Sequence, residues 1–224
     1  YQASYQPFGD IMLTFPGAST GMSDYKRVLV LTTAISKTTY MSKGVRYTRE
    51  YFVSQPDQCL VVRITSDKKQ SITFQAGLRS SHKQSAVRVI DPTTLGLSLQ
   101  VKDGALKGES ILKVNATGGK TRVKNGQIHI SGANEVVLYL TAATNYKNFK
   151  DVSANAAALA KADMDRLAQE NYSGLLNKHL KEYQQYFNRL SLTFGNSAQS
   201  TIATDQGIDR CAGNDDPALS ALYL

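Results

Sequence analysis

The sequence predicts a mainly β protein in which an antiparallel β-sandwich is followed by α-helices. From residue 8 to about residue 143, short runs rich in β-branched and aromatic residues are separated at even spacing by Gly, Asn and Asp turn signals. From about residue 152 the chain becomes rich in Ala and changes to a helical period. No strand alternates with a helix before that point, which argues against a parallel nucleotide-binding sheet.

The expected strands follow one another along the first part of the chain. "RVLVLTTAIS" (27–36) is apolar and β-branched, and "GVRYTREYFVS" (44–54) alternates, with Tyr47, Arg49 and Tyr51 on one side of the pleat. Further strands are expected in "QCLVVRITS", "SITFQAGLRS", "LSLQV", "SILKV", "GQIHISG" and "EVVLYLTAAT". The basic segments "DKKQ" and "GGKTRVKNG" are expected to lie in turns.

Two helices are expected after the strands. The first, "SANAAALAKADMDRLAQEN", would be capped by Ser153 and would bury a face made of Leu159, Met164, Leu167 and Ala168. The second, "YSGLLNKHLKEYQQYFNRL", would present a packing seam made of Leu176, Leu180, Tyr183, Phe187 and Leu190. An extended "SLTFG" and the polar loop "NSAQSTIATDQGIDRCAGND" then lead to "DPALSALYL" (216–224), which begins another helix at Pro217.

Composition favours a globular protein without a nucleic-acid or membrane partner. The 224 residues carry a net charge of +8, but Lys and Arg are scattered, and no nucleic-acid-binding motif accompanies them. Solvated hairpin tips are therefore the favoured explanation of the basic charge. No apolar run approaches the ~18 residues that a membrane helix requires.

Residue patterns that carry chemistry are not found in the sequence. His82, His129 and His179 have no carboxylate neighbour at a spacing that indicates a triad, so surface or packing roles are expected for them. Glu50 and Asp57 are carboxylates of the strand region, but the sequence alone places no acid pair across a cleft, as a glycosidase requires. We therefore assign no catalytic residue, and the substrate-binding residues are unknown at this stage.

The two cysteines also indicate no metal or cofactor site. Cys59 lies in an apolar strand and Cys211 in a polar loop, without the spacing of a zinc site. A buried thiol is expected at Cys59, while a disulfide with Cys211 stays open. No cofactor and no metal ion are expected.

Seven stretches together resemble the N-terminal region of glycoside hydrolase family 95. In chain order they are "YQPFGDIMLTF" (5–15), "YKRVLVLTTAISKTTY" (25–40), "VRYTREYFVSQPDQCLVVRIT" (45–65), "LYLTAATNYKNF" (138–149), "HLKEYQQYFNRLSLTFG" (179–195), "TDQGID" (204–209) and "DPALSALYL" (216–224). The resemblance covers nearly the whole chain, and "YQPFGD", "FVSQPDQ" and "DPALSALY" are its characteristic stretches.

The resemblance implies a β-supersandwich, linker helices, an α/α barrel and a small C-terminal β domain. In these terms, residues 1–145 are expected to form the sandwich without its first strands, residues 146–215 the helical linker and crossing loop, and residues 216–224 the start of a missing barrel. The family's earlier "GNG" and "LNE…LWSG" runs do not occur in the sequence, so the chain is expected to be incomplete at both ends.

The family contains α-L-fucosidases, and some of its members prefer α-L-galactosides. The resemblance implies an inverting mechanism in which a Glu acts as general acid, and an Asp with Asn residues activates water. Those residues belong to the barrel, so none is assigned in this chain, which alone is expected to be inactive. The resemblance also implies a glycan substrate and a bacterial enzyme located in the periplasm or secreted.

Without the barrel, the last helix is expected to bury its apolar face poorly. That face would contain Leu219, Leu222 and Tyr223, so disorder, displaced docking or an intermolecular contact is expected there. Two alternatives stay open for the whole chain. One is a stand-alone carbohydrate-binding sandwich that uses exposed aromatic residues such as Tyr40, Tyr47 and Tyr51, and the other is a basic nucleic-acid binder.

Overall fold

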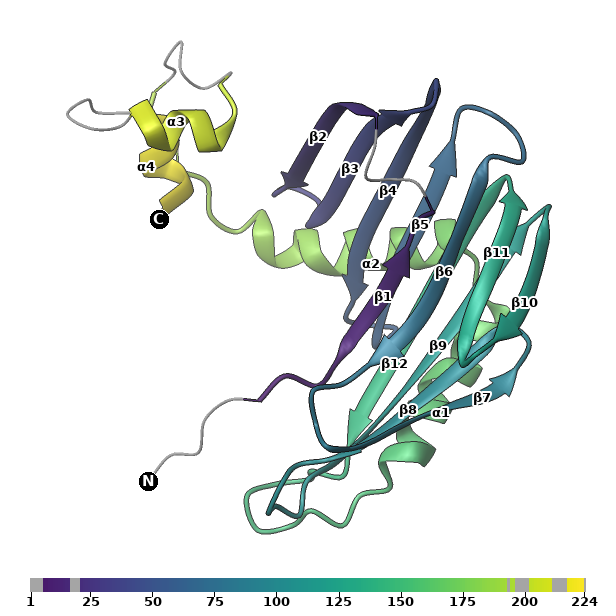
Figure 1. Ribbon diagram of the computed structural model, residues 1–224. Coiled ribbons are helices and arrows are strands. Elements are labelled where there is room, and N and C mark those ends of the chain that lie inside the picture. Colours follow the sequence, from purple (N-terminus) through teal and green to yellow (C-terminus); the bar gives the residue numbers. More distant parts are fainter. Residues whose placement is uncertain (1–5, 17–20, 193, 196–201, 211–216, 224) are drawn as a thin grey trace. The chain divides into compact units, whose positions relative to one another are not determined.

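The computed structural model describes residues 6–16, 21–192, 194–195, 202–210 and 217–223 (Figure 1). The chain divides into two compact units, residues 1–183 and residues 184–224, and each is described by itself. Within the described part of the chain, no helix is both long and apolar enough to cross a membrane.

The first unit contains two antiparallel sheets. In the described residues, the smaller sheet has the strand order β1 (Asp10–Thr14), β6 (Ile72–Arg79), β11 (Gln127–Ala133) and β10 (Lys120–Lys124). The larger sheet has the order β2 (Met22–Val30), β3 (Ile35–Ser42), β4 (Val45–Ser54), β5 (Cys59–Ser66), β12 (Glu135–Thr144), β9 (Lys107–Thr117), β8 (Thr94–Gln100) and β7 (Gln84–Asp91). The predicted mainly β fold with antiparallel sheets is confirmed.

The most apolar strands are those whose side chains form the core between the two sheets. Inward side chains of β5, β12, β9 and β8 meet those of β6 and β11, and the largest of them are fully buried. β2 and β3 contribute no buried residue to this core. The smaller sheet therefore covers only part of the larger one, and β2, β3 and β4 extend past β1 (Figure 1).

Central strands of the larger sheet are buried on both faces. In β5, Val62 and Ile64 face the smaller sheet, while Cys59 and Val61 face the other way, toward the helices. The same alternation occurs in "EVVLYL" of β12. Burial on both faces accounts for the nearly continuous apolar runs of these strands, which a one-sided sheet would interrupt with polar residues.

Three helical segments continue the first unit: α1 (Ala156–Arg166), the 3₁₀ turn η1 (Leu167–Gln169) and α2 (Tyr172–Phe187). α1 packs on β9 and β12, and α2 crosses the same outer face of the larger sheet (Figure 1). α2 extends across the boundary between the two units. The second unit also contains α3 (Thr204–Arg210) and α4 (Pro217–Tyr223), which pack together where Gly207 faces Leu219.

Two sequence predictions about strands are wrong, and one strand was not predicted. The run 27–36 is two strands, because residues 31–34 form a turn in which Ala34 takes a left-handed φ of 50°. The turn carries no Gly, Pro or Asn to signal it. "GGKTRVKNG" contains the edge strand β10 between two glycine turns, since charged side chains can point outward from a sheet edge. β7 was not predicted at all.

The predicted helix faces and loop also need correction. α1 is capped by Asn155, whose Oδ1 accepts a hydrogen bond from the Ala158 N–H at 3.0 Å, so Ser153 is not the cap. Leu159 and Ala168 are exposed, because α1 presents small alanines to the sheet together with Met164. Part of the predicted polar loop forms α3, whose first turn carries an acidic residue that favours a helix N-terminus.

The seam predicted on the second helix is wrong in its register. The buried residues of α2 are Leu175 and His179, which lie one position before the predicted Leu176 and Leu180, and Leu176 is only partly buried. The helix ends at Phe187, before Leu190. The predicted helix at 216–224 is confirmed over Pro217–Tyr223, and the side chains of Leu222 and Tyr223 lie outside the described residues.

Candidate functional site

A second apolar cluster fixes the helices to the outer face of the larger sheet, and we call it the helix–sheet layer. It consists of Phe52, Cys59, Val61, Ile111, Val137, Tyr139, Ala160, Met164, Leu167 and Leu175. Burial of a large apolar side chain contributes about 1.5–3 kcal/mol. This layer therefore anchors α1 and α2 on the sandwich.

His179 is the polar centre of the contact between α2 and the β2–β3 turn. Its Nε2 lies 2.8 Å from the Thr33 carbonyl oxygen, which accepts the hydrogen bond, so Nε2 carries the proton. The imidazole ring stacks on Phe52 and on Tyr183, with centroid separations of 4.9 and 6.0 Å. The Tyr183 hydroxyl donates to the Leu31 carbonyl at 2.6 Å. The packing role expected of His179 is confirmed.

Glu50 belongs to a charged network between the sheet and α2. The Tyr172 hydroxyl donates to Glu50 Oε2 at 3.1 Å, and Lys37 Nζ lies 3.4 Å from Oε1. Arg63 lies between Glu50, at 3.7 Å, and Glu135, at 2.7 Å, and its guanidinium covers the Tyr172 ring at 4.6 Å. Burial and the charge of Glu50 raise the pKa of Tyr172 to about 12, so its hydroxyl stays a donor at neutral pH.

Asp57 holds a neighbouring part of α2. This buried carboxylate accepts a hydrogen bond from the Ser54 hydroxyl at 2.6 Å and one from Lys178 Nζ at 3.1 Å. Lys178 also donates to Glu170 at 2.6 Å. Glu50 and Asp57, the two carboxylates noted in the sequence, are thus both engaged in holding α2 against the sheet.

Cys59 is a buried free thiol in the helix–sheet layer, as predicted. Burial raises its pKa to about 12, with the charge of Asp57 acting in the same direction. A thiol with so high a pKa is a poor nucleophile, which fits a packing role. Cys211 lies outside the described residues, so the question of a disulfide stays open.

A groove of about 670 Å³ lies on the inner face of β2–β4, beside β1. We call it the β1–β4 groove. Its lining is aromatic, apolar and basic, and consists of Leu13, Phe15, Met22, Tyr25, Arg27, Ser36, Thr38, Tyr40, Arg49 and Tyr51. None of these described residues is acidic.

Arg49 occupies the middle of this groove. Strand register aligns Arg27 with Thr38 and Thr38 with Arg49, so a basic row crosses three strands. The Arg49 guanidinium carbon lies 3.9 Å from the Phe15 ring centroid, and Arg49 Nη2 donates to the Tyr40 hydroxyl at 2.7 Å. Arg49 Nε is buried and has no hydrogen-bond partner among the described residues.

The aromatic residues proposed from the sequence as a sugar platform have different environments. Tyr40 is only 3% exposed and stacks on Tyr47 with a centroid separation of 5.3 Å. The Tyr47 hydroxyl donates to the Ser71 carbonyl at 3.1 Å, and burial raises the pKa of Tyr47. Tyr40 and Tyr51 both line the β1–β4 groove, and Tyr47 and Tyr51 also pack against the core between the sheets. Tyr25, which the sequence did not single out, also lines the groove and is 60% exposed.

The remaining histidines lie apart from this groove's lining. His82 Nε2 lies 2.9 Å from the Pro7 carbonyl oxygen, and His129 is paired with Arg122 across the β10–β11 hairpin. Among the described residues, no group of three or more His, Cys, Asp or Glu side chains is arranged to hold a metal ion.

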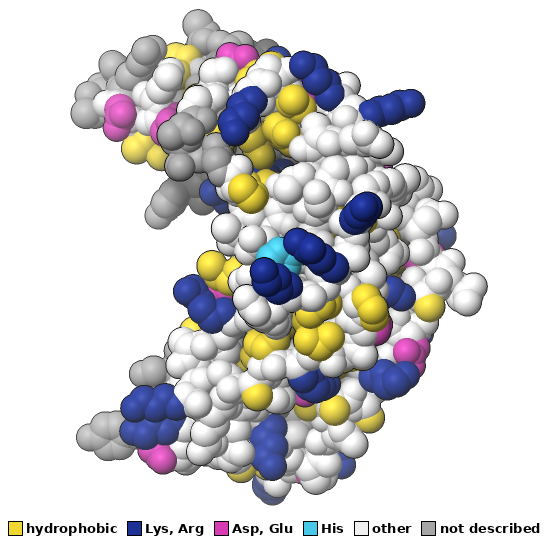
Figure 2. All heavy atoms as spheres, turned by 45° about the vertical axis from the view of Figure 1, so that its right-hand side comes forward, with side chains coloured by type: hydrophobic (Ala, Val, Ile, Leu, Met, Phe, Trp, Pro, Cys, Tyr) yellow, Lys and Arg dark blue, Asp and Glu magenta, His cyan; other side chains and the backbone are white. Residues whose placement is uncertain are grey.

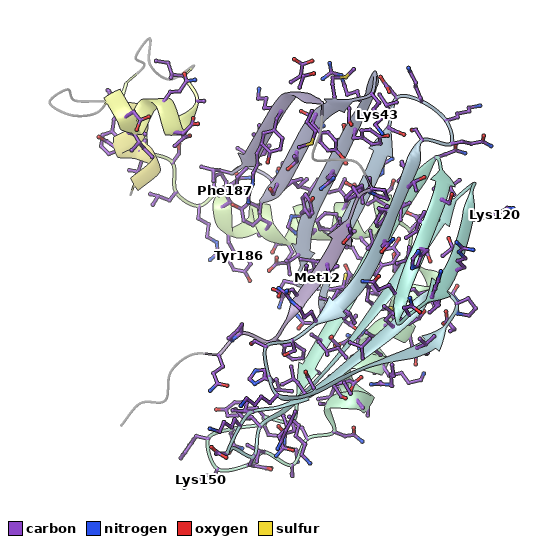
Figure 3. All side chains as sticks on the ribbon, in the orientation of Figure 1. Met12, Lys43, Lys120, Lys150, Tyr186 and Phe187 are labelled. Atoms are coloured by element: carbon purple, nitrogen blue, oxygen red, sulfur yellow. The ribbon has the colours of Figure 1, made fainter. Side chains whose placement is uncertain are left out.

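Basic side chains are distributed widely over the first unit. Figure 2 shows Lys and Arg spread over one face, and Figure 3 shows Lys43 and Lys150 near opposite ends of the sandwich. The prediction that no nucleic acid binds is not tested by this distribution. The sequence placed Arg49 on one face of an alternating strand but suggested no role for it. Its position beside Tyr47 and Tyr51 was nevertheless a signal, because charged residues rarely face a core.

Comparison with known proteins gives two family matches. The family model described as glycosyl hydrolase family 65, N-terminal domain, matches residues 1–149. The model described as glycosyl hydrolase family 95 catalytic domain matches residues 171–224, which begin one residue before α2. The contacts of Glu50 and Asp57 with α2 therefore connect the two matched regions.

Individual relatives agree with these matches. "Alpha-L-fucosidase 2" of Arabidopsis thaliana is 27% identical over 98% of this chain, and "Probable alpha-fucosidase A" of Aspergillus niger is 26% identical over 86%. The chain spans only 30% and 26% of the lengths of these relatives.

A solved structure shares the fold. It is a protein named as a kojibiose phosphorylase from the human microbiome, with a TM-score of 0.56 and 12% identity, and the alignment covers 79% of this chain and 27% of that one. The family model that matches residues 1–149 shows that the chain belongs to the family of glycosyl hydrolase family 65 N-terminal domains, and the matches together identify it as the N-terminal region of an enzyme similar to glycoside hydrolase family 95.

Proposed function

We propose that this chain is the non-catalytic N-terminal region of an inverting glycoside hydrolase. The whole enzyme would hydrolyse terminal α-L-fucosyl or α-L-galactosyl linkages in glycans. Two relatives named as α-fucosidases support the substrate class, because they align along most of the chain. The inverting mechanism rests on the family resemblance alone.

One structural observation carries the role assigned to the chain. α2, which lies in the region matched by the catalytic-domain model, is docked on the sandwich through Leu175 and His179 in its centre and through Tyr172 and Lys178 on charged partners. A helix held by apolar burial together with a buried carboxylate has a defined position. The sandwich would thus fix the start of the catalytic domain and help to wall the sugar site.

The catalytic acid and base are expected beyond residue 224, in the α/α barrel. Glu50 and Asp57, the two carboxylates noted in the sequence, both contact α2. The domain limits 1–145, 146–215 and 216–224 stay predictions, as does the absence of a cofactor. A bacterial source and a periplasmic or secreted location also stay predictions, because the named relatives come from a plant and a fungus.

The proposal is tested with an aryl α-L-fucoside. The natural full-length protein should release the aryl group, and the chain 1–224 should release none under the same conditions. An aryl α-L-galactoside in parallel reports the sugar preference. Turnover by the chain 1–224 alone would contradict the non-catalytic role, and inactivity of the full-length protein on both substrates would contradict the proposed activity.

A second candidate function is a stand-alone carbohydrate-binding sandwich. The observation in its favour is the β1–β4 groove, in which Tyr25 and Tyr51 are available beside the Ser36 and Thr38 hydroxyls. Aromatic faces combined with hydrogen-bonding groups are typical of small-molecule sites. Binding of the chain 1–224 to a glycan array, lost on Tyr25→Ala, would support this function. The absence of any glycan ligand would leave only the structural role.

A further inference from the structure

The outer face of the smaller sheet carries three basic side chains in a row on its edge strand β10. Val123 packs against the core between the sheets, so its alternate neighbours Lys120, Arg122 and Lys124 point to solvent, and all three are exposed. Alternate residues of a strand lie about 6.6 Å apart, so the row is about 13 Å long. Figure 3 shows Lys120 at this edge of the sheet. We call the three residues the β10 row.

The positive charge of the β10 row has no counter-charge in the part of the chain that the structure describes. The ion pairs found there include none of its three members. The sequence contains no acidic residue between Glu109 and Glu135. Neighbouring charges of the same sign repel one another, so an anion from outside the chain would stabilise the row.

Protection of the sheet edge does not by itself account for the row. Charged side chains on an edge strand prevent it from pairing with other chains, and charges of either sign serve this purpose. The edge strand β1 carries Asp10, which is paired with Arg79 at 2.9 Å. The edge strand β2 carries Asp24, which lies 4.0 Å from Arg46. β10 instead carries three cations and no acid, which indicates an anionic partner.

The strands beside the β10 row indicate the chemistry of the rest of the partner. The outward side chains of β11 and β6 include the neutral hydrogen-bonding groups of Gln127, Ser131 and Gln75, which can donate to and accept from sugar hydroxyls. On the outward positions of β6, β10 and β11, His129 carries the only ring. Single-stranded nucleic acids are held by stacking on several aromatic side chains. This face therefore favours a polysaccharide over a nucleic acid.

The arrangement of the row favours an extended chain with carboxylates. Arg122 lies in the middle, and its planar guanidinium can bind a carboxylate through two parallel hydrogen bonds, while the two lysines act as point charges. An open sheet face does not enclose a small molecule as a concave pocket does. A polymer with repeated carboxylates can contact all three cations together, so each contact strengthens the others.

We propose that the β10 row binds a polysaccharide that contains uronic acids. The polymer lies along β10 and places its carboxylates on Lys120, Arg122 and Lys124, while its hydroxyls face the neutral groups of β11. This is a binding site separate from the catalytic site, and it would keep the enzyme attached to an acidic polymer. The inference does not use the proposed fucosidase activity.

Binding of the natural full-length protein to polygalacturonate tests the proposal, with methyl-esterified polygalacturonate as the uncharged polymer of the same backbone. At about 50 mM NaCl, the ester should bind at least ~10-fold more weakly than the acid. Lys120→Gln/Arg122→Gln/Lys124→Gln should weaken binding of the acid at least ~10-fold. The slope of log affinity against log salt concentration should become shallower by about 2, because three charge contacts are lost.

Two further variants serve as controls. Lys68→Gln/Lys69→Gln/Lys83→Gln removes the same charge from exposed lysines that lie outside the strands, and it should change the affinity by less than ~2-fold. Lys120→Arg/Lys124→Arg keeps the charge of the row and should bind like the natural protein.

Four results would overturn the proposal. They are the absence of binding by the natural protein, equal weakening in the two triple variants, equal binding of the acid and its ester, and tighter binding of a single-stranded oligo(dT) than of polygalacturonate. The third would indicate a neutral glycan site, and the fourth a nucleic-acid site.

The same samples separate this inference from the proposed function. Turnover of an aryl α-L-fucoside should be the same in the natural protein and in the glutamine variant of the β10 row, because the small substrate does not reach the row. A natural protein that binds polygalacturonate but does not hydrolyse the fucoside would contradict only the proposed activity. Loss of turnover in the variant alone would place the row in the catalytic site and overturn the inference.

Discussion

Leu175→Ala tests whether α2 is packed on the sandwich as firmly as the structure shows. Leu175 is 0% exposed and lies in the helix–sheet layer. Truncation of a buried leucine to alanine removes apolar contacts and leaves a cavity, which costs 2–5 kcal/mol depending on how far the site collapses. A site between a helix and a sheet that is buried on both faces collapses little, so we expect a loss of about 3 kcal/mol in the free energy of unfolding.

The assay is thermal and urea unfolding of the chain 1–224, followed by circular dichroism. A loss of about 3 kcal/mol corresponds to a decrease of about 6–12 °C in the melting temperature of a domain of this size. Leu159→Ala is the control, because Leu159 lies on α1 but is 47% exposed, and it should cost less than about 1 kcal/mol. Equal losses in the two variants, or a loss below about 1 kcal/mol for Leu175→Ala, would refute the packing of α2 described above.

Three further predictions concern the same unit. Because burial raises the pKa of Cys59 from 9.0 to about 12 and that of Tyr172 from 10.0 to about 12, the folded state holds both protons more tightly than the unfolded state. The contribution of these two groups to stability should be constant below about pH 9 and should fall between about pH 9 and 12. A urea midpoint that stays level between about pH 9 and 12 would contradict this. Tyr172→Phe should lower the free energy of unfolding by about 1 kcal/mol at pH 7, because it removes the hydrogen bond to Glu50. An unchanged free energy of unfolding would contradict this and would mean that water replaces the Tyr172 hydroxyl as the partner of Glu50. Gly119→Ala should destabilise the protein more than Gly126→Ala. Both glycines have φ near 70°, but an added Cβ would lie 2.4 Å from a backbone oxygen at Gly119 and in open space at Gly126. Equal melting temperatures of the two variants would refute this prediction.

The alternation and clustering of apolar residues along the sequence predicted the strands well where the apolar side chains are buried. The alternation of residues 44–54 and the apolar runs of β5 and β12 correspond to strands with defined inner and outer faces. The sequence pattern failed where the residue types of a segment are typical of a different structure from the one that the segment adopts. The turn at residues 31–34 contains no Gly, Pro or Asn, β10 is charged because it is an edge strand, and α1 packs through Ala160 rather than Leu159. A small residue such as alanine lets the helix lie close to the sheet, and the sequence pattern does not show how close the helix and the sheet are.

The candidate site was less accessible from the sequence than the fold. Glu50 and Asp57 were noticed as carboxylates, but their partners Tyr172 and Lys178 lie 122 and 121 residues away along the chain. Such pairs depend on the sheet order and on the path of α2. Arg49 likewise became informative only when Phe15, which directly follows β1 of the other sheet, was placed against its guanidinium.

The central claim is that this chain is the N-terminal, non-catalytic part of an inverting fucosidase-like hydrolase. The most direct test is a proton NMR time course of an α-L-fucoside with the natural full-length protein and, in parallel, with the chain 1–224. We expect β-L-fucose to appear first with the full-length protein, because inversion changes the anomer, and no fucose with the chain alone. Initial release of α-L-fucose, or release of any fucose by the chain 1–224, would contradict the claim.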